Sequence, residues 1–472
     1  MKKNYYFYSY FLLFLGLLFL TYSCKSYEKE NETTFFGGKI KNPKGAYVYF
    51  SKDDKIIDSA KINQQNRFSF ALDSITTGLY TFKHGVEYQY LYLEPQDSLL
   101  IYLNTWDFDE SLIFSGKGSV NNNFMINLFL QQEKIEKKFK NYYRLNEEEF
   151  SQKVDEEQKN LMLQYNDLIK SQDEELTEFF ENLAQAIINY PLYSKKEFYP
   201  LWHKDANNKH DNPTVSDRFY DYRKNLNYND KSLFNLRAYT YYLESLLYNL
   251  AYNKQKIDPA QDNFSLNFMT SVNEILVDEK LKNKYLASGF WGSFKDHLTD
   301  EQQKESQDYF FKNCTNEVYL AEAKHAIDQC NQLKNGDKLP ELVVMDSDNN
   351  EVNIHEVVNN KKTVIYFWPK DYGRSEKLMK KIPIYKEKYP EILFIGIERN
   401  KTNDAWKEFL TTNKLPNINQ YLIDENCKLY SWFDGDMART LIVDKNGIVN
   451  NGFLFFNDTY NLEKNLHLLK KQ

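Results

Sequence analysis

The spacing of apolar residues changes its period twice along the chain. Short alternating runs typical of strands occupy 34–118, helical three- and four-residue spacings follow over 119–335, and strand-like and helix-like segments alternate over 336–472. With 472 residues the chain is also longer than one hydrophobic core normally supports. We therefore predict an all-β sandwich-like domain, an α-helical middle region and a C-terminal α/β domain.

The predicted β-domain contains five short runs rich in aromatic and β-branched residues. Breaks such as Asn42-Pro43 and Thr77-Gly78 separate them at the spacing of an antiparallel sandwich. The runs are Tyr47–Phe50, Phe68–Leu72, Leu79–Phe82, Tyr90–Leu93 and Leu99–Leu103. Together with the closing stretch Phe114–Gly118, this segment resembles the small β-domain that precedes thioredoxin-like domains in many envelope lipoproteins.

The middle region carries apolar stripes at helical spacing. One predicted buried helix face contains Tyr239, Tyr242, Leu243, Leu246, Leu247 and Leu250. Two pairs, Asn146 with Glu149 and Thr299 with Gln302, have the spacing of capping boxes that open helices. We interpret the aromatic stripes as core and not as a cofactor site, and we predict no cofactor.

A loop is predicted from Pro200 to Pro213. It contains four side chains of types that bind metals, His203, Asp205, His210 and Asp211. Nothing in their spacing fixes a coordination geometry, so we interpret them as solvated side chains and predict no metal site.

The C-terminal region alternates strands and helices. Thr363–Trp368 and Ile392–Ile397 are predicted buried strands, each followed by a helix, Glu376–Tyr389 and Asn403–Thr412 respectively. Asn446-Gly447 lies between two apolar runs, which is a strong hairpin signal, and a last helix is predicted over Leu462–Lys470. This order predicts an α/β sheet.

The N-terminus has the pattern of an export signal. Lys2 and Lys3 precede the apolar run Phe11–Leu20, and Ser23-Cys24 then resembles the lipobox of bacterial lipoproteins, although Thr21 stands where Leu is usual. We predict a signal peptide over 1–23, lipidation of Cys24 and a charged tether over 24–33. The alternatives are an uncleaved membrane anchor or an ordinary signal with an incidental cysteine.

Two of the remaining cysteines, Cys314 and Cys330, flank a predicted helix over Asn316–Gln329. At 1.5 Å per residue their Cα atoms would lie about 24 Å apart, far beyond the reach of a disulfide. We predict that they do not pair with each other.

The region 336–472 resembles the secreted thioredoxin-like proteins, of the TlpA/ResA type, that reduce or exchange disulfides in the bacterial envelope. The resemblance lies in Gly336–Glu341, in Phe367-Trp368 and in Thr440–Gly447. It implies a thioredoxin-like fold and, after Phe367-Trp368, an active-site pair of cysteines that begins a helix.

This chain departs from the family at the site that carries the chemistry. The corresponding residues are Asp371-Tyr372-Gly373-Arg374-Ser375, and Ala438 stands where the family places a cis-proline. The family's reaction needs a thiolate at the helix N-terminus and a second thiol to resolve the mixed disulfide, and neither a phenol nor a hydroxyl replaces them. A non-proline cis bond costs about 2.5–4 kcal/mol, so we expect a trans bond at Ala438 and an altered substrate groove.

Other chemistries at this position are also disfavoured. A peroxiredoxin loop would need Thr and Cys at positions 373 and 376, where this chain has Gly373 and Glu376. Ser375 has no histidine or lysine partner that the sequence places beside it, and Cys427 is interpreted as a bystander thiol.

The first hypothesis is a non-catalytic lipoprotein of the cell envelope, with the outer membrane expected and the membrane face left open. Its candidate binding face for a protein or peptide consists of Trp368, Tyr372, Arg374 and Met437. The alternative is a thiol-disulfide oxidoreductase that uses Cys427 or a partner. A formal net charge of -7 gives no electrostatic reason to expect nucleic acid as a partner.

Overall fold

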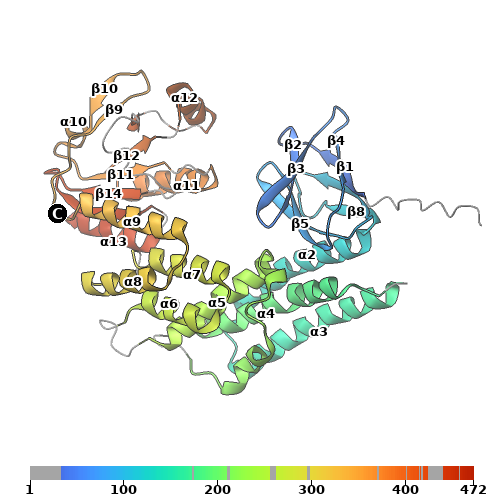
Figure 1. Cartoon of the computed structure of the whole chain (residues 1–472). Coiled ribbons are helices and arrows are strands. Elements are labelled where there is room, and N and C mark those ends of the chain that lie inside the picture. Colours follow the sequence, from blue (N-terminus) through green and yellow to red (C-terminus); the bar gives the residue numbers. More distant parts are fainter. Residues whose placement is uncertain are drawn as a thin grey trace, which may run out of the picture. The chain divides into compact units, whose positions relative to one another are not determined.

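The structure is a computed structural model with two compact units, 1–246 and 247–472. It describes residues 33–172, 175–209, 213–255, 262–294, 298–368, 372–399, 401–413, 415, 418–423, 439–456 and 458–471, and only the backbone of 372–377. The elements of each unit are labelled in Figure 1.

The first unit begins with two four-stranded sheets, in the orders β4-β1-β7-β8 and β3-β2-β5-β6. All five predicted strands are present, and three more join them. Pairing is antiparallel except between β1 and β7, which run parallel. The strands are β1 (Thr34–Lys41), β2 (Tyr47–Lys52), β3 (Lys55–Lys61), β4 (Arg67–Leu72), β5 (Gly78–His84), β6 (Glu87–Leu93), β7 (Ser98–Asn104) and β8 (Ile113–Lys117).

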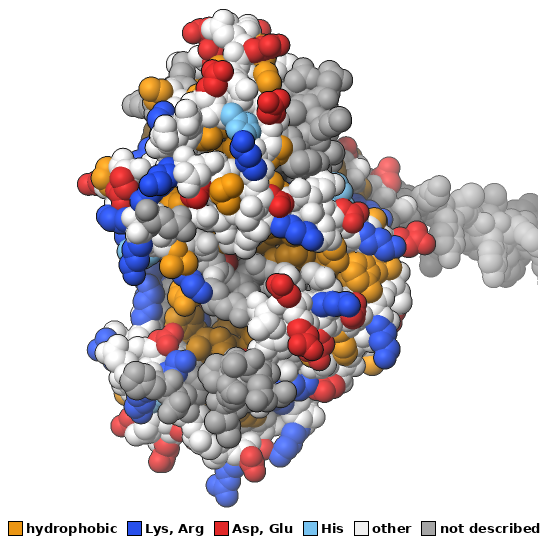
Figure 2. Space-filling view, turned by 90° about the vertical axis from the view of Figure 1, so that its left-hand side faces the viewer, with side chains coloured by type: hydrophobic (Ala, Val, Ile, Leu, Met, Phe, Trp, Pro, Cys, Tyr) orange, Lys and Arg blue, Asp and Glu red, His pale blue; other side chains and the backbone are white. Residues whose placement is uncertain are grey.

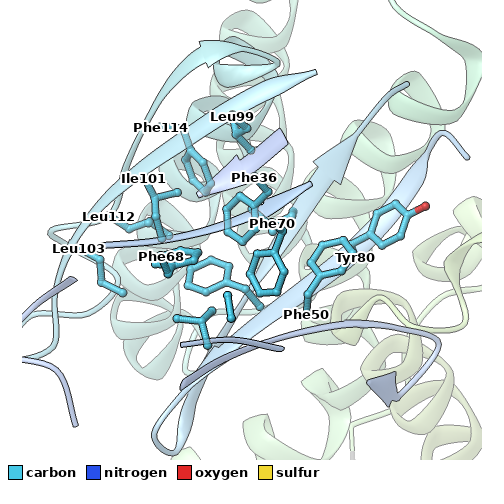
Figure 3. Packing of buried hydrophobic residues seen from close by; sticks show 14 of the residues in the cluster. Phe36, Phe50, Phe68, Phe70, Tyr80, Leu99, Ile101, Leu103, Leu112 and Phe114 are labelled. Atoms are coloured by element: carbon cyan, nitrogen blue, oxygen red, sulfur yellow. The ribbon is translucent and has the colours of Figure 1, made fainter. Parts of the chain in front are cut away.

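Aromatic side chains from both sheets form the core between them (Figure 3). β4 buries every second residue, as a strand with one solvated face must. Phe36 stacks on Phe70 with ring centroids 5.8 Å apart, and Phe50 stacks on Tyr80 at 5.1 Å. Gly38 lets β1 and β7 approach, since a Cβ there would lie 2.2 Å from the carbonyl oxygen of Ile101.

Helices follow the sheets in the same unit: α2 (Ser119–Tyr142), α3 (Glu147–Ser171), α4 (Glu178–Ala206), η1 (Asp217–Asn225), η2 (Lys231–Leu233) and α5 (Arg237–Asn253), within which the unit boundary falls. The predicted capping box of Asn146 and Glu149 opens α3. Asn122 of α2 fixes this helix to β6, because its side-chain amide donates to the Tyr92 carbonyl at 2.7 Å and accepts from the Tyr92 amide at 2.9 Å.

The predicted loop at Pro200 is wrong. α4 continues through Pro200 to Ala206 and includes His203. Packing overrides the usual effect of proline here, since the Tyr199 hydroxyl donates to the Leu145 carbonyl at 2.9 Å and the buried His203 ring lies 3.0 Å from the Tyr143 carbonyl.

The second unit contains four further helices ahead of its sheet: α6 (Phe264–Ile275), α7 (Glu279–Gly292), α8 (Asp300–Asn313) and α9 (Glu317–Gln332). Thr299 and Gln302 form the predicted capping box of α8. Cys314 follows α8 and Cys330 lies in α9, and both thiols are free, which confirms that they do not pair.

Seven strands then form one sheet in the order β10-β9-β13-β12-β11-β14-β15. β11 pairs parallel with β12 and antiparallel with β14, and β14 pairs antiparallel with β15, which supports the thioredoxin-like prediction. The elements are β9 (Val343–Met345), β10 (Glu351–Asn353), α10 (Ile354–Val358), β11 (Thr363–Phe367), α11 (Tyr372–Lys388), β12 (Leu393–Glu398), α12 (Asn403–Thr412), β13 (Gln420–Leu422), β14 (Arg439–Val443), β15 (Val449–Phe455) and α13 (Thr459–Lys471).

Apolar clusters cover both faces of this sheet. Residues of α11, α12 and α13 pack on one face with Val364 and Tyr366, and α10 packs on the other with Ile365 and Phe367. The predicted Asn-Gly hairpin connects β14 and β15, with Gly447 at φ 77° and the Asp444 amide donating to the Ile448 carbonyl at 2.9 Å.

Candidate functional site

The candidate site lies where the parallel strands β11, β12 and β13 end at one edge of the sheet. Parallel strands bring their carboxyl ends together, and ligands of open α/β sheets bind there. The segment after β11 leads into α11, so positions 372–375 occupy the first turn of that helix. The side chains at Tyr372, Gly373, Arg374 and Ser375, and the whole of Cys24, Cys427, Met437 and Ala438, lie outside the described residues.

Trp368 does not belong to an exposed binding face, contrary to the prediction. Its side chain is 1% exposed and packs edge-to-face on Trp406 and Phe409, at 5.4 and 5.6 Å between ring centroids. Trp368 continues the alternation of β11, on the same face as Val364 and Tyr366. This position therefore supports the site from within the core.

A buried polar triad joins β11 and β13 beneath the site. The Trp368 indole donates to Gln420 Oε1 at 3.0 Å, and Gln420 Nε2 donates to the Tyr366 hydroxyl at 2.8 Å. Burial raises the pKa of Tyr366, so its phenol stays neutral. Gly396 makes room for the triad, because a Cβ there would lie 2.2 Å from Gln420 Oε1.

A buried carboxylate marks the end of β12. The Glu398 side chain is fully buried and pairs with Lys401 at 2.8 Å, while its other oxygen accepts from the Arg399 amide at 3.0 Å. The Lys401 ammonium also lies 4.9 Å from the Phe409 ring centroid and 5.7 Å from that of Trp406. In these contacts Glu398 accepts hydrogen bonds from Lys401 and from the Arg399 amide, which is a structural role.

The two described thiols are poorly suited to redox chemistry. Burial raises the pKa of Cys330 to about 12, and it also raises the pKa of Cys314. Thiol exchange needs thiolate, which a raised pKa removes at neutral pH. Neither residue lies on the strands that end at the candidate site.

Two of the four side chains considered for a metal, His203 and Asp205, lie in α4. His203 is buried in α4 with its ring against the Tyr143 carbonyl, and His210 and Asp211 lie outside the described residues. Over the described part of the chain, no group of three or more His, Cys, Asp or Glu side chains is placed to hold a metal ion.

Surface charge and hydropathy add two further observations. On the face shown in Figure 2, the described acidic and basic side chains are interspersed and not segregated by sign. No helix among the described residues has both the length and the apolar character needed to cross a bilayer.

Gln420 and Glu398 are the site residues that sequence reasoning missed. Gln420 reaches the site only through sheet register, which places it opposite Gly396, and no local pattern reveals that pairing. Glu398 carries a weak signal, since it is a lone carboxylate that ends an otherwise apolar strand.

Comparison with known proteins gives structural likenesses only. No family model matches the chain, and no curated protein does. The thioredoxin domain of a thiol-disulfide oxidoreductase from Bacteroides vulgatus is 19% identical, with a TM-score of 0.25, and covers 28% of this chain and 97% of its own. A thiol:disulfide interchange protein from a Bacteroides species is 21% identical, with a TM-score of 0.23; the match covers 28% of this chain and 90% of that protein. A peroxiredoxin-like protein from Aquifex aeolicus is 20% identical, with a TM-score of 0.23; the match covers 28% of this chain and 88% of that protein. The thioredoxin-like assignment rests on the strand order described above.

Proposed function

We propose that this chain is a lipid-anchored protein of the cell envelope whose thioredoxin-like domain lacks thiol chemistry and serves as a binding or structural module. The observation that carries the proposal is the sequence at the start of α11, where Tyr372 and Ser375 stand in place of the cysteine pair. The only cysteine between 336 and 472 is Cys427. The raised pKa values of Cys314 and Cys330 agree with the absence of an alternative thiolate.

The proposed binding face is now smaller than the sequence suggested. Tyr372 and Arg374, in the first turn of α11, remain candidates together with Met437, whereas Trp368 is buried and is no longer part of the proposed face. Aromatic and arginine side chains are favoured anchors for a protein or peptide partner. Nothing in the charge balance favours nucleic acid.

A disulfide reductase assay tests the absence of thiol chemistry. The chain without residues 1–24 should reduce a protein disulfide no faster than dithiothreitol alone, and Cys427→Ser should leave that rate unchanged. Turnover above this background that Cys427→Ser abolishes would establish the alternative function, a thiol-disulfide oxidoreductase. As a positive control, Tyr372→Cys with Ser375→Cys should give partial activity, because Ala438 still replaces the cis-proline.

Membrane anchoring is tested through Cys24. The full chain should partition into detergent and carry acyl groups on Cys24, and Cys24→Ala should release it from the membrane fraction. An unmodified Cys24 in the intact mass of membrane-bound protein would refute the proposal of a lipid anchor.

A further inference from the structure

A groove on the helices of the first unit is separate from the candidate site in the thioredoxin-like domain. It has a volume of about 390 Å³ and is lined by residues from the end of α2, the second half of α4 and α5. This volume falls within the usual range of small-molecule sites. The groove residues of α4 include Ser194, Phe198, Trp202 and Ala206, which follow one another at four-residue steps along one helix face.

Aromatic rings from three elements line the groove. Tyr143 lies beside Trp202 with 6.3 Å between ring centroids, and Phe198 lies beside Tyr241 at 6.0 Å. Trp202 is 47% exposed and Tyr241 is 39% exposed, so both rings are accessible from the groove. Such rings offer an apolar body a surface to stack on.

The charged residues of the groove leave one cation available. Lys195, whose side chain is 8% exposed, pairs with Glu136 across the groove. Lys140 lies one turn after Glu136 on α2 and is exposed, and no described carboxylate lies within 4 Å of its ammonium. The lining therefore carries two ammonium groups and a single carboxylate.

We propose that this groove binds a ligand with an aromatic or apolar body and one carboxylate, such as the C-terminal phenylalanine of a peptide. The rings of Trp202 and Tyr241 receive the body, and the Lys140 ammonium receives the carboxylate. A free arylalkyl acid has the same chemistry as a peptide C-terminus. The proposal does not depend on whether the thioredoxin-like domain has redox activity.

Fluorescence polarisation with a labelled Gly-Gly-Gly-Phe peptide tests the proposal on the full chain in lipid nanodiscs, with empty nanodiscs as the blank. The peptide with a free carboxylate should bind, and its C-terminal amide should bind several-fold more weakly. Trp202→Ala should weaken binding about 10-fold or more. Lys140→Met should weaken it about 3- to 10-fold, since an exposed ion pair contributes modestly, and Lys140→Arg should retain it.

Matched controls separate these effects from general destabilisation. Trp106→Ala removes another exposed tryptophan of the same unit, and Lys170→Met removes another lysine from the last turn of a helix. Both should leave the affinity unchanged. Because Lys140 is exposed, Lys140→Met tests the proposal even if Trp202→Ala fails to fold.

Competition identifies the source of the ligand. Displacement by 3-phenylpropionate at concentrations similar to those of unlabelled peptide would show that a small acid is sufficient, and displacement by the peptide alone would identify a peptide C-terminus. Equal affinity for the acid and the amide, unchanged affinity in both Trp202→Ala and Lys140→Met, or no binding up to about 1 mM would each overturn the proposal.

Discussion

Substituting Gln420 should lower the unfolding temperature of the thioredoxin-like domain, because this side chain hydrogen-bonds one buried donor and one buried acceptor at once. In Gln420→Leu, the Trp368 indole and the Tyr366 hydroxyl lose their hydrogen bonds to Gln420 inside the core. Each buried polar group left without a partner costs about 1–3 kcal/mol, so with two such groups the free energy of unfolding should fall by about 2–6 kcal/mol. For a unit of this size the melting temperature should then fall by about 5–15 °C.

A double-mutant cycle tests the reason for this loss. Tyr366→Phe removes one of the two stranded groups, so the pair Tyr366→Phe with Gln420→Leu should cost at least about 1 kcal/mol less than the sum of the single changes. Urea unfolding followed by tryptophan fluorescence and calorimetry gives these values. Gln332→Leu, at an exposed glutamine of α9, is the matched control and should change stability by less than about 0.5 kcal/mol. Additive costs, or a loss below about 1 kcal/mol in Gln420→Leu, would refute the role of the triad.

Three further predictions concern buried titratable groups. His84→Ala should destabilise the β-domain by about 1–3 kcal/mol in urea unfolding. The His84 ring accepts from the Lys44 amide at 2.8 Å and donates to the Tyr47 carbonyl at 3.0 Å, and both hydrogen bonds would be lost. His467→Ala, at an exposed position, is the control and should have little effect. In a single-cysteine variant that retains Cys330, Ellman's reagent at pH 8 should react on the order of 10³-fold more slowly with native than with unfolded chain, since burial raises the pKa of Cys330 to about 12. Burial also raises the pKa of Asp97, so the folded state keeps the Asp97 proton at pH values where the unfolded state has lost it. The free energy of unfolding should therefore fall as pH rises from about 4. In urea titrations, Asp97→Asn should make the free energy of unfolding depend less on pH.

The local pattern of the sequence was sufficient for most of the C-terminal domain. α12 has the predicted bounds, Asn403–Thr412, because Thr402 caps it and its apolar period is regular. β3 was missed because Ala60 is its only buried residue, so its outer face dominates the pattern. The sequence predicts a loop from Pro200, but contacts of Tyr199 and His203 with the residues after α2 hold α4 together there.

The candidate site was less predictable than the fold. The burial of Trp368 was available from the sequence, since Val364, Tyr366 and Trp368 alternate along one strand face. The hydrogen-bond partner of Trp368 could not be predicted from the sequence, because Gln420 reaches Trp368 only through the pairing of β13 with β12. The groove of Trp202 and Tyr241 was hidden for a similar reason, since helical spacing identified apolar stripes but not which of them meet in space.

The fold of this domain and the thiol chemistry of thioredoxin-like oxidoreductases depend on different residues, so the proposed function is compatible with a fold that persists without the chemistry. The sheet is held by the apolar faces of β11 and β12 and by the triad of Tyr366, Gln420 and Trp368, and none of these residues carries sulfur. Thiol-disulfide exchange instead requires cysteines, which the resemblance to thioredoxin-like oxidoreductases places in the first turn of the following helix. On the proposed function, Tyr372 and Ser375 at these positions remove the chemistry and leave the apolar faces of β11 and β12 in place. On the same proposal, selection for a different contact can act on the first turn of α11.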